Sequence, residues 1–381
     1  MKITGLKTFL VKENGIGRNF IFLKISTDEG IEGIGEAYPT GKAKATETVL
    51  HDYERWLAGK DPTRVVYHWQ ALYRGSRFPL GTITMGALSG VELALWDIIG
   101  KRYGAPIYKL LGGPCRDKIR AYTHLQGSTP EELAEEARVL VKKGYTAMKF
   151  VPYPPDYCTL GPNAIVKRAV ERVRAVREAV GDDVDILLDY HGTEFSAANA
   201  ARMAKALEPF QPLFLEEPVL HENVDAMLEV KNKTTIPIAT GERLFTRYGF
   251  RELLDKRAVD IIQPDPIACG GILETLRIGA MAEAYYVSLA PHNPCGPVAT
   301  AGCLHVDACA PNFLIQEHIP DDSPFRGSLV DEPMKLERGY FHLPTRPGLG
   351  IELDEEGLAR YPFEPYDRRV AIREDGSIGL V

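Results

Sequence analysis

The hydrophobic and polar positions in the first third of the chain predict three strands followed by three helices. The strand segments are rich in β-branched and apolar residues and are Ile3–Val11, Phe20–Thr27 and Ile31–Glu36. The helical segments carry apolar residues every three to four positions and are Lys42–Ala58, Val65–Tyr73 and Thr84–Tyr103. Gly112-Gly113-Pro114 then breaks the chain. We therefore expect an α+β capping domain over residues 1–113.

After this break, short apolar strands alternate with longer amphipathic helices. The expected strands are Arg120–Thr123, Ala147–Phe150, Asp185–Asp189, Leu213–Glu216, Ile238–Thr240, Ile261–Gln263, Ser288–Ala290 and Leu314–Glu317. The helices expected between them include Pro130–Lys143, Ala164–Val180, Ala197–Leu207, Gly270–Ala284 and Val298–Ala310. Eight strands with intervening helices predict an α/β fold, a (β/α)7β TIM-like barrel over residues 114–320.

The last part of the chain lacks this alternation. Residues 321–381 contain many Pro and Gly residues and one strand-like stretch, Tyr340–Leu343. We expect this C-terminal segment to pack on the capping domain and complete it.

Composition excludes several classes of partner. The net charge is −7 and there is no Lys/Arg-rich run, which argues against a nucleic-acid binder. We see no signal peptide and no apolar run long enough to span a bilayer, so we expect no membrane partner. The six cysteines form no CxxC pair, which suits a reduced, cytoplasmic protein. We also expect a homo-oligomer.

Three carboxylates end successive strands of the predicted barrel. Glu216 lies one strand–helix unit after Asp189, and Glu242 lies one unit after Glu216. In a β/α barrel the strand ends meet at one rim, and three carboxylates there need a counter-charge. Mg²⁺ prefers oxygen ligands, so we expect these residues to be its ligands, with one ion per subunit. The alternative is that each carboxylate caps a helix or faces solvent.

Two histidines belong to the same rim. His292 ends a strand next to the one ending in Asp265, and an Asp beside a His fixes its tautomer and raises its basicity. Because no Ser or Cys stands in an elbow motif, we interpret His292 as a general base. His191 lies two residues beyond Asp189 and faces the same cavity, where we interpret it as a general acid. A loop-bound His292 and a metal-bound or buried His191 are the alternatives.

Lys149 and Glu317 end the second and eighth strands. Lys149 can stabilise a bound carboxylate, and Glu317 can donate to one if it is protonated, which burial beside other acids favours. Either residue can instead be a solvated charge.

With these strand ends, the sequence resembles the mandelate racemase subgroup of the enolase superfamily over essentially its whole length. Within it, the motifs most resemble those of D-galactonate dehydratases. The stretches that carry the resemblance include Asp189-Tyr190-His191-Gly192, Glu216-Glu217-Pro218-Val219, Gly241-Glu242-Arg243, Gln263-Pro264-Asp265, Ala290-Pro291-His292 and Pro347-Gly348-Leu349-Gly350.

The resemblance implies a dehydratase of a sugar acid, an aldonate such as D-galactonate or a related 2R-hydroxy acid. It implies that His292 with Asp265 removes the α-proton, that His191 protonates the departing 3-hydroxyl, and that Glu317 supports a metal-stabilised enediolate. The product is a 2-keto-3-deoxy acid. Enediolate chemistry of this kind is general to the enolase superfamily.

Some features depart from the family pattern or leave other functions open. Val151 stands where mandelate racemase has the second lysine of its Lys-x-Lys motif, which argues against a two-base racemase. We expect loops carrying Arg18 and Tyr38 to cap the substrate. The alternatives are an epimerase or cycloisomerase of the same superfamily and a non-catalytic sugar-acid-binding barrel. A hydrolytic metal barrel needs a His-x-His motif after the first barrel strand, and Thr123-His124-Leu125-Gln126 does not supply one.

Overall fold

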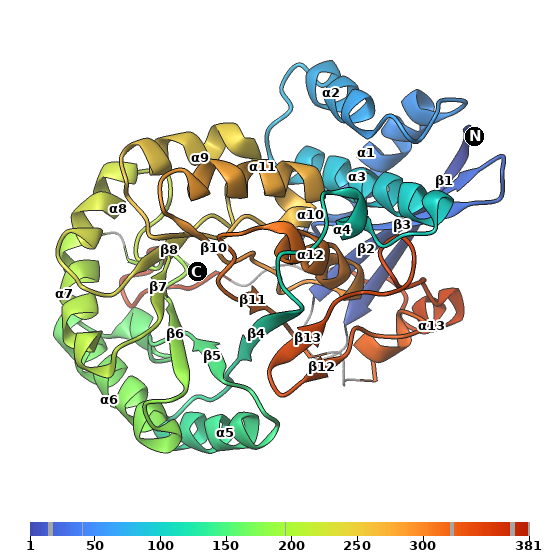
Figure 1. Cartoon of the computed structure of the whole chain (residues 1–381). Helices are drawn as coiled ribbons and strands as arrows, with labels where there is room; N and C mark the ends of the chain where they lie inside the picture. Colours follow the sequence, from blue (N-terminus) through green and yellow to red (C-terminus); the bar gives the residue numbers. More distant parts are fainter. Residues whose placement is uncertain (14–17, 40, 195, 321–323, 366–369, 380–381) are drawn as a thin grey trace.

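The computed structural model describes residues 1–13, 18–39, 41–194, 196–320, 324–365 and 370–379. Its first domain is an antiparallel sheet of order β1-β2-β3 with helices packed on it (Figure 1). The strands are β1 (Ile3–Glu13), β2 (Arg18–Thr27) and β3 (Glu32–Ala37). The helices are α1 (Ala43–Leu57), α2 (Val65–Gly75), α3 (Thr82–Tyr103) and the short α4 (Ile107–Leu110). The three predicted strands and three predicted helices are all present.

Helix α3 is the central element of this domain. It is long and apolar enough to cross a membrane by length and composition, so the expectation that no such run exists was wrong. However, 83% of its apolar window is buried inside the protein, where α3 packs on β3 and α1. Its apolar surface is therefore used by the protein core.

The second domain is the predicted barrel of eight parallel strands. Each strand from β4 to β10 pairs with the next, β11 pairs with β4, and a bridge between Leu289 and Phe313 links β10 to the segment before β11. The strands are β4 (Lys118–His124), β5 (Ala147–Phe150), β6 (Asp185–Asp189), β7 (Phe214–Glu216), β8 (Ile238–Thr240), β9 (Ile261–Ile262), β10 (Ser288–Leu289) and β11 (Gln316–Glu317).

Each strand path contributes a buried side chain to one cluster inside the barrel. Its members are Tyr122, Ala147, Leu187, Phe214, Ala239, Ile261, Ala290 and Ile315. Side chains fill the interior of such barrels, so catalytic groups have room only at the rim. The barrel fold is confirmed.

Helices surround the barrel (Figure 1). They are α5 (Pro130–Lys142), α6 (Pro162–Val180), α7 (Ala197–Leu207), α8 (Val224–Lys231), α9 (Thr246–Asp255), α10 (Pro266–Cys269), α11 (Ile272–Glu283) and α12 (Pro297–Cys309), with 3-10 turns at Tyr157–Thr159 and Glu208–Phe210. The helix expected over 270–284 begins instead at Ile272. Gly270 and Gly271 have φ angles of 131° and 97°, which separate α10 from α11.

The C-terminal segment contacts both domains. It contains a 3-10 turn (Arg326–Ser328), β12 (Leu336–Glu337), β13 (Tyr340–His342) and α13 (Glu355–Ala359). Strand β13 pairs antiparallel with β4 of the barrel, whereas Pro362 forms a bridge with Val11 of β1. The segment thus also extends the barrel sheet, in addition to the expected packing on the first domain. The boundaries at 113 and 320 stay predictions.

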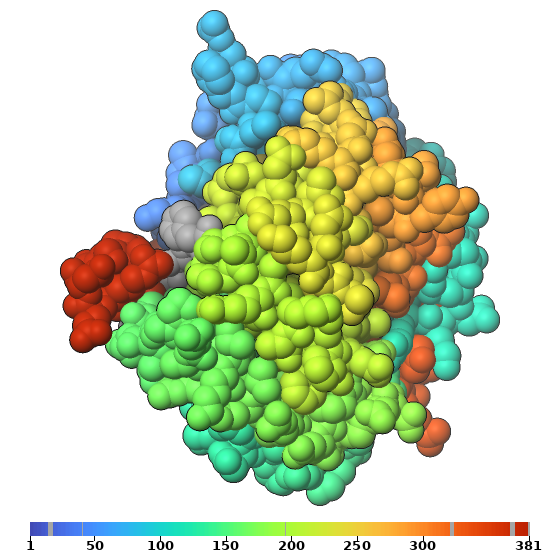
Figure 2. Space-filling model, turned by 90° about the vertical axis from the view of Figure 1, so that its left-hand side faces the viewer, coloured from blue at the N-terminus to red at the C-terminus, as the bar shows by residue number. Residues whose placement is uncertain are grey.

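In the space-filling view, the blue residues of the capping domain lie beside the yellow and orange residues of the barrel domain (Figure 2). Glu36 of β3 reaches across this junction, and its buried carboxylate accepts the backbone N–H groups of Gly296 (2.7 Å) and Ala299 (2.9 Å). It thereby caps α12, since the first N–H groups of a helix have no partner within the helix. This contact fixes the capping domain against the loop that carries His292.

Candidate active site

The predicted site residues lie at the carboxyl ends of the barrel strands. Asp189 of β6 pairs in register with Glu216 of β7, and His124 of β4 pairs with Lys149 of β5. Lys149 pairs with Leu187, two residues before Asp189, so its long side chain extends to the level of Asp189 and Glu216. Strands β6 and β10 are the third and seventh of eight in the closed barrel. His191 and His292, which follow them, consequently approach the rim from opposite sides.

Lys149 lies among carboxylates and is 2% exposed. Its Nζ is 2.9 Å from Glu216 Oε2, 2.8 Å from Glu317 Oε1 and 3.2 Å from Asp189 Oδ2. Burial alone lowers the pKa of Lys149. The surrounding carboxylates raise it by more than burial lowers it, so the net pKa lies well above the usual value. Lys149 is therefore a permanent cation at the base of the site.

The three carboxylates expected to bind metal lie at the rim, but they face different partners. Burial, followed by repulsion from Asp189, raises the pKa of Glu216 to about 8, and its buried Oε1 has no hydrogen-bond partner. Glu242 instead places Oε2 3.0 Å from His292 Nε2. Across the described ranges, no three His, Cys, Asp or Glu side chains are grouped as metal ligands. The shared Mg²⁺ site stays a prediction.

The chemistry of these residues nevertheless fits a hard cation. All the donors are carboxylate oxygens from adjacent strands, and Mg²⁺ prefers such ligands. Glu216 Oε1 is an unsatisfied buried oxygen, and a group of this kind requires a counter-charge or a partner.

His292 forms the predicted dyad with Asp265. Its Nδ1 lies 2.8 Å from Asp265 Oδ2, and both residues are buried. Asp265 is itself fixed, because its other oxygen accepts the backbone N–H of Ile267 at the start of α10. Burial lowers the pKa of His292, but the carboxylates of Glu242 and Glu317 and the bond to Asp265 raise it well above the usual value. Asp265 thus orients the imidazole, and the carboxylates of Glu242 and Glu317 favour its protonated form.

His191 is held by the backbone at the turn after β6. It has a φ of 50° and Gly192 has a φ of 62°, so the chain reverses there through two left-handed residues. The His191 backbone N–H donates to Asp189 Oδ1 (2.8 Å), and its Nε2 lies 3.1 Å from Asp189 Oδ2. The side chain is 36% exposed and lines the main cavity.

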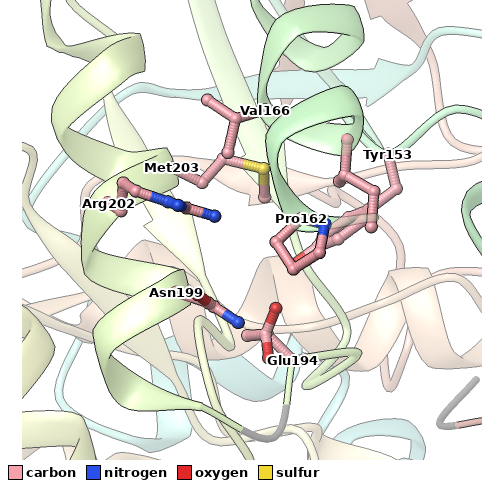
Figure 3. A pocket seen from close by; sticks show the side chains of 8 residues that line it. Tyr153, Pro162, Val166, Glu194, Asn199, Arg202 and Met203 are labelled. Atoms are coloured by element: carbon pink, nitrogen blue, oxygen red, sulfur yellow. The ribbon is translucent and has the colours of Figure 1, made fainter. Parts of the chain in front are cut away.

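That cavity has a volume of about 170 Å³. The residues that line it are His124, Leu125, Gln126, Gly127, Leu133, Lys149, Phe150, Val151, Arg172, Asp189 and His191. A second pocket lies between α6 and α7, where Glu194, Asn199 and Arg202 surround it (Figure 3). It holds only about 10 Å³, which is too small for a sugar acid. The larger cavity, which contains His191 and Lys149, is the candidate substrate site.

Glu317 lies among cations, whereas a protonated side chain there was considered from the sequence. Its Oε1 faces both Lys149 Nζ and His124 Nε2 (2.5 Å), and its Oε2 accepts the Asn293 backbone N–H (2.7 Å). Burial raises its pKa, but Lys149, His292 and His124 lower it well below the usual range. The neighbouring cations outweigh burial and favour an ionised Glu317, and its contact with a substrate carboxylate stays a prediction.

Arg18 and Tyr38 lie beside the loop that carries His292. Arg18 Nη1 donates to the Pro294 carbonyl, and the Tyr38 ring lies 6.4 Å from the His292 ring. Substrate contact by either residue stays a prediction. In the loops expected to carry Arg18 and Tyr38, residues 14–17 and 40 lie outside the described part.

Two residues of the site were not singled out from the sequence. His124 was weighed only as part of a missing His-x-His motif, although its place at the end of the first barrel strand was a sufficient signal. Arg243 follows Glu242 and donates from Nε to both oxygens of buried Glu217 at 2.9 Å. The Glu216-Glu217 pair in the sequence gives no sign of which carboxylate has this partner.

The sequence matches two family descriptions that together cover most of the chain. Residues 16–112 match the mandelate racemase/muconate lactonizing enzyme N-terminal domain, and residues 132–357 match the enolase C-terminal domain-like description. The chain therefore belongs to the mandelate racemase/muconate lactonizing enzyme family of the enolase superfamily. It is a hydro-lyase of this superfamily.

Its relatives include two D-galactonate dehydratases. One, from Variovorax paradoxus (strain S110), is 40% identical over 99% of both chains, and the other, from Cronobacter sakazakii, is 41% identical over 93% of both. Among solved structures, an enolase from Agrobacterium radiobacter, described as a candidate galactarate dehydratase with Na and L-malate bound, is 35% identical. It covers 100% of both chains with a TM-score of 0.94.

Proposed function

We propose that this protein is a Mg²⁺-dependent dehydratase of an aldonate, such as D-galactonate or a related 2R-hydroxy acid, and that it forms the 2-keto-3-deoxy acid. The observation that carries the proposal is the pair of histidines on opposite strands of the rim, one bonded to Asp265 and one open to the cavity. The names of the D-galactonate dehydratases support the substrate class.

His292 is the base in this proposal. An α-proton next to a carboxylate is weakly acidic, so its removal requires a positioned base of high proton affinity. Asp265 accepts the Nδ1–H of His292, so Nε2 is the atom that would take the proton once its contact with Glu242 is released. After the transfer, Asp265 stabilises the imidazolium.

His191 is the acid that delivers a proton to the departing 3-hydroxyl. It lines the cavity and is more exposed than His292, with 36% and 6% of the side chain accessible. This access lets it meet a substrate carbon beyond the carboxylate. Loss of hydroxide from C3 needs such a proton because hydroxide is a poor leaving group.

Asp189, Glu216 and Glu242 would hold one Mg²⁺ per subunit. The ion supplies positive charge that stabilises the negative charge developing on the substrate carboxylate. Lys149 adds a fixed positive charge at the same level of the rim. Glu317 holds that lysine in place through its Oε1.

The environment of Lys149 argues against a two-base epimerase. Three carboxylates surround its ammonium group, which keeps it protonated, and Val151 supplies no second lysine. A single base that removes the α-proton, with an acid placed for C3, suits dehydration better. No observation favours a cycloisomerase or a non-catalytic binding protein.

The test is a screen of the purified protein with Mg²⁺ against aldonic and aldaric acids of all C4 and C5 configurations. We expect a 2-keto-3-deoxy product from at least one aldonate with the 2R configuration. An epimer without loss of water would support the epimerase, and no change in any acid would contradict an enzymatic role in this substrate class.

A further inference from the structure

His124 ends β4 at the side of the main cavity, and the proposed reaction gives it no role. Its Nε2 lies 2.5 Å from Glu317 Oε1, and 27% of the side chain is accessible. Within the described residues, its Nδ1 has no hydrogen-bond partner, and it is not among the buried unsatisfied atoms. One ring nitrogen is therefore fixed by the protein, while the other is reachable from the cavity.

The cavity extends along the rim from His191 in the turn after β6, past Lys149 on β5, to His124 on β4. If His191 meets the C3 hydroxyl, the carbons beyond C3 have this cavity available to them. Exposed Gln126 lines the same wall and offers both a donor and an acceptor.

The charges of the cavity wall favour a neutral, hydroxylated chain there over a second carboxylate. Arg172 is the cation that would suit a distal carboxylate, but its Nη1 and Nη2 donate to the carbonyls of Ser128 (2.6 Å) and Gly127 (3.2 Å). Its Nε is buried without a partner, out of reach of solvent. The guanidinium is thus used to hold the loop after β4.

We propose that this cavity is the subsite for the hydroxylated carbons of the sugar acid beyond C3, and that His124 is its specificity-determining residue, accepting a hydrogen bond from a substrate hydroxyl at Nδ1. This inference rests on the proposed function and deepens it by separating aldonates from diacids.

The protonation of His124 agrees with this role. Burial lowers its pKa below the usual value, although the contact with Glu317 raises it. The ring is then neutral near pH 7, and its single proton lies on Nε2, where it donates to the ionised Glu317. A neutral imidazole with its proton on Nε2 has an acceptor at Nδ1.

Two substitutions of His124 separate the substrate contact from the contact with Glu317. Gln can place its amide nitrogen near the position of Nε2 and keep the bond to Glu317, whereas Asn places a polar atom near the position of Nδ1. The substrates are the aldonate that is dehydrated fastest in the screen, with D-galactonate tested first, and its 4-deoxy, 5-deoxy and 6-deoxy analogues. The measured quantity is kcat/KM for the 2-keto-3-deoxy product.

In the unaltered protein, we expect at least one deoxy analogue to lose roughly 10-fold or more in kcat/KM, because the missing hydroxyl leaves an acceptor unpaired. His124→Gln should reduce this discrimination to about 2-fold, whereas His124→Asn should keep most of it and lose mainly kcat. A merely structural role would change all substrates by the same factor.

Different results would contradict the proposed function and the role of His124. If no aldonate is dehydrated, the proposed function is wrong and this inference falls with it. If aldonates are dehydrated but all the analogues react equally, or His124→Gln discriminates as the unaltered protein does, only the role of His124 is refuted. A matched diacid with a higher kcat/KM than its aldonate would also refute the subsite.

Discussion

Glu92, in helix α3 of the capping domain, accepts the backbone N–H of Ile272 at 2.8 Å across the junction with the barrel. It also accepts the N–H of Leu273 (3.0 Å) and the indole N–H of Trp96 (2.9 Å). Together with Glu36 at α12, it gives the capping domain two buried carboxylates that cap barrel helices. These contacts hold the domain over the rim.

The first prediction concerns the pH dependence of stability through Glu92. Burial raises its folded pKa from 4.5 to about 7, although three hydrogen bonds oppose this. A raised folded pKa means that the stabilising contribution is complete below pH 4.5 and is lost as pH rises through 7. Relative to Glu92→Gln, the unaltered protein should lose about 3 kcal/mol of unfolding free energy between pH 4.5 and 8.

Denaturant unfolding of both proteins at several pH values measures this difference. The exposed Glu131 at the start of α5 provides the control, since Glu131→Gln should follow the unaltered protein at every pH. Parallel pH curves for Glu92→Gln and the unaltered protein would show that Glu92 stays ionised in the junction.

The second prediction concerns the turn that places His191. Gly192 has a φ of 62°, and a Cβ there would lie 2.5 Å from Leu220 Cδ2. Gly192→Ala should therefore displace the turn and reduce kcat by roughly 10-fold or more, besides the backbone cost of about 1 kcal/mol. Gly30→Ala is the matched control, because Gly30 has a φ of 76° with no atom within 4 Å.

The role of this turn would be contradicted if both alanine variants kept full activity and lost the same amount of stability. Unfolding and initial-rate measurements on the same preparations separate backbone strain from displacement of His191.

The third prediction concerns the metal. Removal of divalent ions with EDTA should abolish turnover, and Mg²⁺ should restore it. Glu242→Gln should lower Mg²⁺ affinity and remove activity with the fold intact, because a carboxylate ligand is lost. Exposed Glu222, in the loop after β7, supplies the control Glu222→Gln, which should bind Mg²⁺ normally. Unchanged turnover in EDTA would exclude the metal.

The fourth prediction concerns Asp265. Asp265→Asn removes the charge that orients and stabilises His292, and kcat should fall roughly 100- to 10,000-fold while KM changes little. The acid side of the pH–rate profile should also move to lower pH, because the pKa of His292 loses one of the groups that raise it. A variant with normal kcat would show that the dyad has no part in proton abstraction.

The barrel and its rim could be predicted because their signals are local. Strand-end residues such as Asp189 and Glu216 recur once per strand–helix unit, and the structure pairs these two in register. The break of a helix at Gly270 and the pairing of β13 with β4 were missed, because one depends on two backbone angles and the other on a long-range contact.

The protonation and the partners of each side chain were harder to predict than its position. For Glu317, burial beside other acids favoured protonation in the sequence analysis, yet its pairing with Lys149 and His124 depends on which neighbours the closed barrel brings together. Glu92 and Glu36 gave no signal at all, because their partners are backbone N–H groups in another domain.

The central claim is the division of labour between the two histidines. It is tested most directly by NMR in D₂O, following exchange of the α-proton and formation of product from an accepted aldonate. His292→Asn should lose both, because the base is gone, whereas His191→Asn should lose dehydration and retain exchange of the α-proton. If His292→Asn still exchanged the α-proton while His191→Asn did not, the assignment of base and acid would be reversed.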